Sequence, residues 1–166
     1  MSSLENDEYL KKCIREYDEC LDNDIVKKYI LYNELAESYY SHRDESPEYL
    51  ALSEEYAKKN IEIMPKIIEE YNRKRDENDG KSVFQSKDCV LLFSKEEDND
   101  ECQSYPPSNW CYQNSIDRLR IIYTKSNRIA DAIELCEYGS QLLEEAGLSH
   151  LTESLENAKE KLLKKL

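Results

Sequence analysis

The sequence predicts an all-α protein built from amphipathic helices. Apolar residues recur at intervals of three and four positions through most of the chain, which is the period of a helix with one buried face. Only three Gly and four Pro occur among 166 residues, fewer than the turns of an all-β fold need. A chain of this length buries roughly two-thirds of its unfolded surface, so residues 1–166 are expected to form one domain.

Three helices are predicted in the first part of the chain. Residues 4–21 carry one apolar stripe, formed by Leu10, Cys13, Ile14, Tyr17 and Leu21. Residues 25–43 carry a second stripe, formed by Ile25, Tyr29, Tyr32, Leu35, Ala36 and Tyr39. Ser46-Pro47-Glu48 indicates the start of the third helix, because it combines an N-cap hydroxyl, proline at the first helical position and an acid. Pro65 lacks a backbone donor, so this helix bends there or stops and restarts before ending near Arg73.

Residues 76–108 depart from this pattern. Two acidic runs without periodicity, 76–80 and 95–101, flank the apolar island 89–93. We expect an acidic loop excursion whose island docks onto the helices, although a short helix or a strand at the island also fits the pattern.

Three further helices are predicted after residue 111. The fourth covers residues 112–125, and the fifth covers 129–146 and ends at Gly147. The last helix carries Leu148, Leu151, Leu155, Ala158 and Leu162. Its leucines are spaced near a heptad, so a homodimer seam is an alternative to packing within the chain.

The charge of the chain excludes several kinds of partner. The net charge is −13, which repels nucleic acid and anionic membrane surfaces. It keeps a helical protein soluble, or it steers basic partners. No apolar run approaches 18 residues, and the acidic start 1–8 is unlike a signal peptide, so a cytoplasmic protein is expected.

The sequence carries no catalytic motif, and we expect no enzyme activity and no cofactor. The histidines are His42 and His150, and no phosphate loop or zinc-protease motif occurs. The six cysteines form no C-x-x-C pair, so no metal site is expected and free thiols are favoured. Cys89, Cys102 and Cys111 cluster in or beside the acidic loop, where a metal or disulfide role is the alternative.

Two stretches share a pattern of spaced residues. Downstream, Ile116-x2-Leu119-Arg120-x2-Tyr123 is followed by Ala132-x3-Cys136. Upstream, Tyr32-x2-Leu35-Ala36-x2-Tyr39 is followed by Ser53-x3-Ala57 and Pro65, with a turn about five residues longer. The pattern resembles the tetratricopeptide repeat (TPR), most clearly at residues 112–146. Asn127 stands where the family turns with Gly, and Asn tolerates that backbone.

The resemblance implies a TPR-like α-solenoid, an array of antiparallel helix hairpins. Two copies are fewer than the three that usually bury a continuous core. The helices at 4–21 and 148–164 would therefore cap the array, and residues 66–111 could hold a degenerate middle repeat. Arg120 replaces the family's Gly or Ala, so that helix packs further from its partner or Arg120 points outward.

The resemblance also implies a binding groove lined by the first helix of each repeat. Chaperone-binding members grip a terminal carboxylate with basic residues, whereas Glu37 and Asp117 would repel one, so a basic or neutral ligand fits better. The lining carried over to this chain is Asn33, Glu37, Tyr40, Asn114, Asp117, Ile121, Thr124 and Lys125.

The sequence therefore predicts a non-catalytic interaction module that binds a peptide or helix of a partner protein. The alternative is an acidic inhibitor or nucleic-acid mimic acting on a basic protein. Arg118, Arg120, Lys125 and Arg128 form a basic strip. We expect it to pair internally with Glu134, Glu137 or the acidic loop, and the alternative is that it faces an acidic partner or a nucleic acid.

Overall fold

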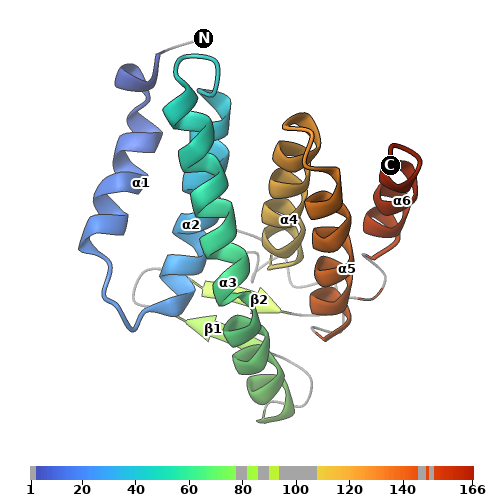
Figure 1. The fold of residues 1–166 in the computed structure, drawn as a ribbon. Helices are drawn as coiled ribbons and strands as arrows, with labels where there is room; N and C mark the ends of the chain where they lie inside the picture. The colour runs from blue at the N-terminus through green and yellow to red at the C-terminus, as the bar shows by residue number, and fades with distance from the viewer. Residues whose placement is uncertain (1–2, 78–81, 86–89, 94–107, 146–148, 150–151) are drawn as a thin grey trace.

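The computed structural model describes residues 3–77, 82–85, 90–93, 108–145, 149 and 152–166 (Figure 1). In these residues six α-helices pack against one another, so the prediction of a helical fold is confirmed. A short 3-10 helix, Leu4–Asn6, precedes them. The helices are α1 Glu8–Glu19, α2 Ile25–Ser41, α3 Pro47–Glu77, α4 Ser108–Lys125, α5 Ile129–Glu145 and α6 Thr152–Leu163.

Side-chain caps fix where the first helices begin. The Asp7 side chain accepts a hydrogen bond from the Leu10 amide at 3.0 Å, and Asp24 accepts one from the Lys27 amide at 3.1 Å. α1 ends at Glu19, two residues before Leu21. Leu21 is 63% exposed, so its predicted place on the buried stripe is wrong.

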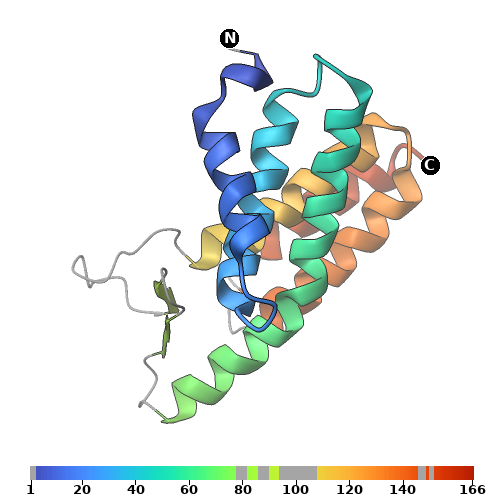
Figure 2. The same ribbon diagram turned by 90° about the vertical axis from the view of Figure 1, so that its left-hand side faces the viewer.

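α3 runs through Pro65 without a break, so of the two predicted alternatives the helix bends there and does not stop and restart. Figure 2 shows that α3 changes direction along its length, as a helix containing an interior proline does. The bend carries the second half of α3 away from the other helices (Figure 2).

The apolar island forms a strand, which was one of the alternatives left open. β1, Ser82–Gln85, pairs antiparallel with β2, Val90–Phe93, in a register that places Val83 opposite Leu92. β1 contacts α3 and β2 contacts α4, at the side of the helical body seen in Figure 2. The expected loop excursion therefore contains a hairpin at these positions. The degenerate middle repeat stays a prediction. The acidic run 95–101 lies outside the described residues.

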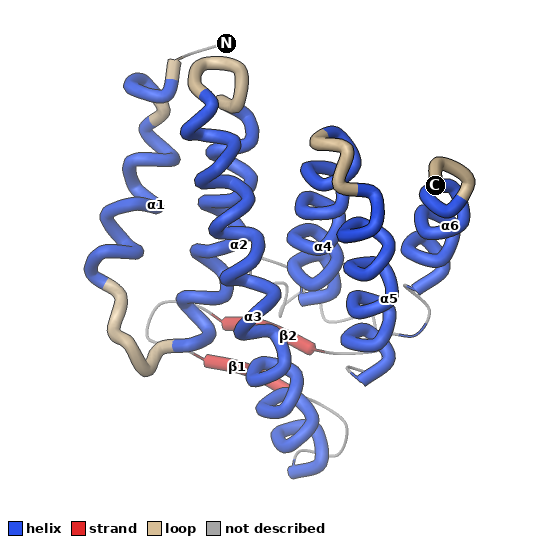
Figure 3. The backbone as a smooth tube through the Cα atoms, in the orientation of Figure 1, coloured by secondary structure: helices blue, strands red, loops and turns tan. Residues whose placement is uncertain are grey.

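The helices form a row with α1 at one end and α6 at the other (Figures 1 and 3). Each helix contacts the next in sequence, and α2 also contacts α4 directly. The chain therefore brings together two segments that are separated by more than 60 residues.

Two hydrophobic cores stabilise this row. The larger core draws on α2 to α6 and includes Met64, Ile116 and Leu143. The smaller core joins α1 to α2 through Leu10, Cys13, Leu31, Leu35 and Tyr39. Five tyrosines extend it, with neighbouring ring centroids 5.6–6.3 Å apart: Tyr17, Tyr32, Tyr39, Tyr49 and Tyr56.

The leucines of α6 pack within the chain. Leu155 and Leu162 are buried in the larger core, whereas Leu163 is 47% exposed. A Cβ built on Gly139 of α5 would lie 2.9 Å from the Ile116 side chain and 3.1 Å from that of Leu155. Gly139 therefore allows α4 and α6 to approach α5 closely. Leu148 and Leu151 lie outside the described residues.

Candidate functional site

Five of the eight predicted lining residues meet where α2 packs beside α4. We call this contact the α2–α4 seam: Asn33, Glu37 and Tyr40 from α2, and Asn114, Ser115, Arg118 and Lys125 from α4. Residues three, four and seven positions apart share one face of a helix, which is why these side chains face each other in order along the seam. The seam has an inner part at Asn33, a middle at Glu37 and an outer end at Tyr40.

The inner part of the seam is a buried hydrogen-bonded cluster. Asn33 Oδ1 accepts hydrogen bonds from Asn114 Nδ2 at 3.1 Å and from Ser115 Oγ at 3.0 Å. Asn33 and Ser115 have no exposed surface. The expectation that Asn33 lines an open groove is therefore wrong, because its amide instead joins α2 to α4.

The middle of the seam is a two-point ion pair. Arg118 Nε and Nη2 donate to the two carboxylate oxygens of Glu37 at 2.9 and 2.8 Å. Both side chains are largely covered. Bidentate pairs of this kind fix orientation as well as charge, so Glu37 is neutralised by a residue that the predicted lining omitted.

The outer end of the seam surrounds Tyr40 with cations. The guanidinium carbon of Arg118 lies 3.7 Å from the Tyr40 ring centroid, and that of Arg43 lies 4.2 Å from it. Lys125 Nζ donates to the Tyr40 hydroxyl at 3.2 Å, and Arg43 Nη1 donates to the Tyr40 carbonyl at 3.0 Å. Within the described residues, neither Arg43 nor Lys125 forms an ion pair with a carboxylate.

The other three predicted lining residues lie on α4 without a described contact to α2. Asp117 lies 3.7 Å from Arg120 Nη2, and burial raises the pKa of Asp117 although Arg120 opposes this shift. The Thr124 hydroxyl donates to the Arg120 carbonyl at 2.8 Å, and Ile121 is half-buried. Arg120 itself is half-buried beside Asp117. The half-buried Arg120 side chain is therefore not turned fully outward, which was one of the two alternatives that the sequence suggested.

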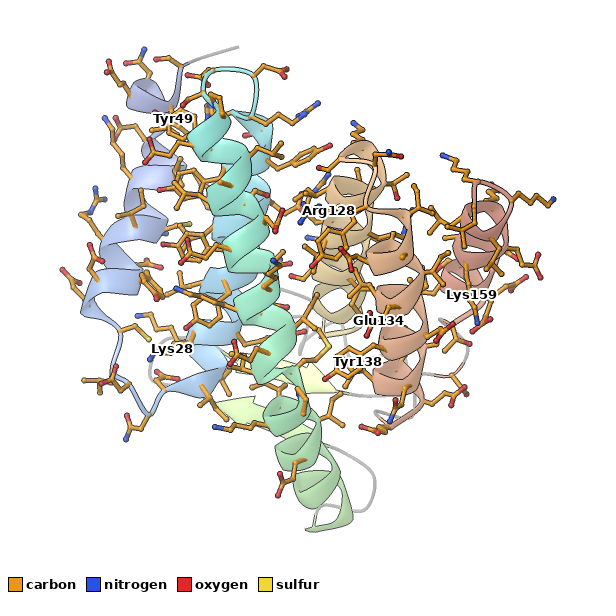
Figure 4. All side chains as sticks on the ribbon, viewed as in Figure 1. Lys28, Tyr49, Arg128, Glu134, Tyr138 and Lys159 are labelled. Atoms are coloured by element: carbon orange, nitrogen blue, oxygen red, sulfur yellow. The ribbon has the colours of Figure 1, made fainter. Side chains whose placement is uncertain are left out.

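Three residues of the basic strip form ion pairs within the chain, with other partners than expected, whereas Lys125 donates to the Tyr40 hydroxyl. Arg128 Nη1 donates to Glu54 at 3.2 Å, and its guanidinium lies 4.5 Å from the Tyr123 ring centroid. The hydrogen bond from Arg128 lowers the pKa of Glu54 to about 2. Figure 4 shows Arg128 beside α3 and Glu134 further along α5. Glu137 instead pairs with Lys159 of α6 at 3.2 Å.

A second polar cluster, which sequence reasoning missed, lies around His42. This buried imidazole contacts Asp7 through Nε2, at 2.7 Å, and Glu45 through Nδ1. His42 follows α2, Asp7 precedes α1 and Glu45 precedes α3, so three helix ends meet there. No short motif contains all three residues, and only the position of His42 beside a helix end was visible in the sequence.

The described part of the chain was predicted to hold no metal site and to have free thiols. No group of three His, Cys, Asp or Glu residues there could hold a metal ion. Cys13, Cys20 and Cys136 are free thiols, while Cys89 and Cys102 lie outside the described residues. Burial raises the pKa of Cys13 to about 11, which keeps this thiol protonated at neutral pH.

No family model matches the sequence, and no curated protein or solved structure matches it significantly. Among the described helices, none has the length and apolar character that crossing a membrane requires.

Proposed function

We propose that the protein is a non-catalytic interaction module, working without a cofactor, that binds a segment of a partner protein on the α2–α4 face. The supporting observation is the side-by-side placement of α2 and α4, which contact each other through the seam. These are the two helices in which the sequence resembles the first helix of a TPR. In that family, neighbouring first helices form the binding surface.

Details of the second helix pair agree with this proposal. α4 and α5 are joined by a turn in which Asn127 has a positive φ of 60°, the conformation for which the family uses Gly. Leu119 and Ala132 are buried between the helices, as the repeat pattern requires. α1 and α6 then stand at the ends of the row as capping helices.

The surface available to a partner is narrower than the predicted lining. Asn33 is buried and Glu37 is paired with Arg118. Ile121 and Thr124 keep exposed area on α4, and Lys125 is exposed at its end. Tyr40 is also buried, beneath the guanidinium groups of Arg43 and Arg118. A partner segment would therefore lie along α4 towards Lys125.

Site-specific photocrosslinking tests the proposal. A photoreactive amino acid replaces Ile121 or Thr124 in the full chain, expressed in its native cells. The matched controls carry it at Glu55 or Glu62, which are exposed on α3. We expect a discrete adduct from the α4 positions that an excess of unlabelled protein suppresses, and none from the α3 positions. Equal labelling from both helices, or no competable adduct from α4, would contradict the proposed face.

A further inference from the structure

The outer end of the seam gathers positive charge in a strongly acidic protein. Arg43, Arg118 and Lys125 all contact Tyr40: their charged groups lie 3.7 to 5.8 Å from its ring centroid, and Lys125 Nζ lies 3.2 Å from its hydroxyl. Glu37 is the acid paired there, and both of its oxygens are occupied by Arg118. Among the described residues, Arg118 is ion-paired with Glu37, whereas Arg43 and Lys125 have no ion-paired carboxylate and in this sense are uncompensated.

The two uncompensated cations come from different helices and meet by folding. Arg43 follows the end of α2 and Lys125 is the last residue of α4. Arg43 donates one hydrogen bond to the Tyr40 carbonyl, and Lys125 donates one to the Tyr40 hydroxyl. Both keep further N–H donors, because a guanidinium has five and an ammonium has three.

The net charge of the chain does not cancel this local charge. At physiological ionic strength, charges more than about 8 Å apart are largely screened, so an approaching group responds mainly to its nearest neighbours. Asp117, the other acid expected to repel an anion, lies 3.7 Å from Arg120 Nη2 and also interacts with Arg118. With Glu37 and Asp117 both beside an arginine, the charge argument for a basic or neutral ligand is weaker at this end of the face.

We propose that Arg43 and Lys125, held on Tyr40, bind the side-chain carboxylates of an acidic segment in the partner protein. The carboxylates lie between the two cations and accept hydrogen bonds from their remaining donors. This proposal rests on the proposed function, since it names the chemistry of the partner that the α2–α4 face binds. It places the acidic residues of the partner at the Tyr40 end of the segment.

Titration with a defined acidic peptide tests this assignment. The probe is hexaglutamate, acetylated and amidated so that only side-chain carboxylates carry charge, added to the isotope-labelled full chain and followed by NMR. We expect amide shifts at residues 40–43 and 125, with affinity falling as salt rises. In Arg43→Gln/Lys125→Gln the dissociation constant should rise at least tenfold. In Lys161→Gln/Lys164→Gln, which removes the same charge near the C-terminus, it should change less than twofold.

Each result bears on the proposal. Equal weakening in the two double variants, or no shifts near Tyr40 at millimolar peptide, would overturn it. Lys125→Glu is the second variant, because this exposed side chain can be reversed without disturbing the core, and it should abolish the shifts. Crosslinking from positions 121 and 124 without peptide binding would leave the interaction face standing and remove the acidic partner. Peptide binding without crosslinking would remove the proposed interaction face and leave only a carboxylate-binding site at Arg43 and Lys125.

Discussion

His42 Nε2 lies 2.7 Å from Asp7 Oδ2 and joins the end of α2 to the start of α1. The same histidine contacts Glu45, whose other carboxylate oxygen accepts a hydrogen bond from the Leu4 amide at 2.9 Å. Asp7 also caps α1. These contacts attach the first turn of α1 to the α2–α3 turn. A second attachment, from the Tyr9 hydroxyl to Glu34 at 2.5 Å, also starts from the first turn of α1.

Raising the pH should loosen the start of α1. The hydrogen bond to Asp7, together with Glu45, raises the pKa of His42 above its usual 6.5, although burial opposes the shift. A raised pKa means that this stabilisation is complete below pH 6.5 and is lost as pH rises through the folded-state value. Hydrogen exchange, corrected for its intrinsic pH dependence, should therefore accelerate in residues 4–12 between pH 6 and pH 8.5 but not in α5. His42→Gln should remove this difference, and its persistence in that variant would contradict the assignment.

Acid should weaken the link between α3 and the α4–α5 turn. Glu54 accepts hydrogen bonds from Arg128 and from Lys58, the latter at 2.7 Å, and its pKa falls from 4.5 to about 2. A lowered pKa gives stability that is present above pH 4.5 and is lost as pH falls towards 2. Glu54→Gln should therefore lower the free energy of unfolding at pH 7, with a deficit that shrinks below pH 4.5. Urea titrations at pH 7 and at a pH below 4.5 check this, with Glu62→Gln on the exposed face of α3 as the control. A deficit that is equal at both pH values would argue against the ion pair.

Leu119 should contribute strongly to stability. It is almost fully buried in the larger core, so Leu119→Ala should cost about 2–5 kcal/mol in the free energy of unfolding. Leu163→Ala removes the same atoms from a side chain that is 47% exposed, and it should cost much less. Chemical denaturation of both variants makes the comparison. A loss below about 0.5 kcal/mol at Leu119 would place it outside the core.

Adding a side chain at Gly139 should strain the packing of α4 and α6 on α5. Its Cβ would meet Ile116 at 2.9 Å, and the branched Ile116 side chain has little freedom to move. Gly139→Val should therefore destabilise the protein by about 1–3 kcal/mol, outweighing any gain in helix propensity. Ile116→Ala should cost less in the Gly139→Val background than alone, which a double-mutant cycle measures. Strictly additive losses would mean that the two side chains do not compete for space.

Helix positions were predictable because the apolar period and the caps act locally. Asp24, Ser46 and Pro47 mark helix starts in the sequence and stand there in the structure. Leu21 was misplaced because periodicity continued past the end of α1 at Glu19. The hairpin was harder to predict, since a short apolar island fits a strand or a helix until its pairing partner, Ser82–Gln85, is known.

The seam was predictable only in part. The repeat resemblance identified Asn33, Glu37, Tyr40 and Lys125 as neighbours of one surface, and the structure brings them together. The resemblance could not show that Arg118 forms an ion pair with Glu37, or that the Arg43 guanidinium lies over the Tyr40 ring. Those contacts depend on the distance between α2 and α4, which no local spacing determines.

The two ends of the helix row differ in a way that limits how copies of this chain can assemble. The outward side of α1 is mostly charged, with Lys11, Lys12, Arg15 and Glu19 exposed, so further stacking at that end would take charged groups out of water. The far end carries Leu163 and Leu166, which are 47% and 77% exposed. Two copies that met through this end would pair like end with like end around a two-fold axis. Such a contact closes at two copies, whereas head-to-tail growth would continue into a filament.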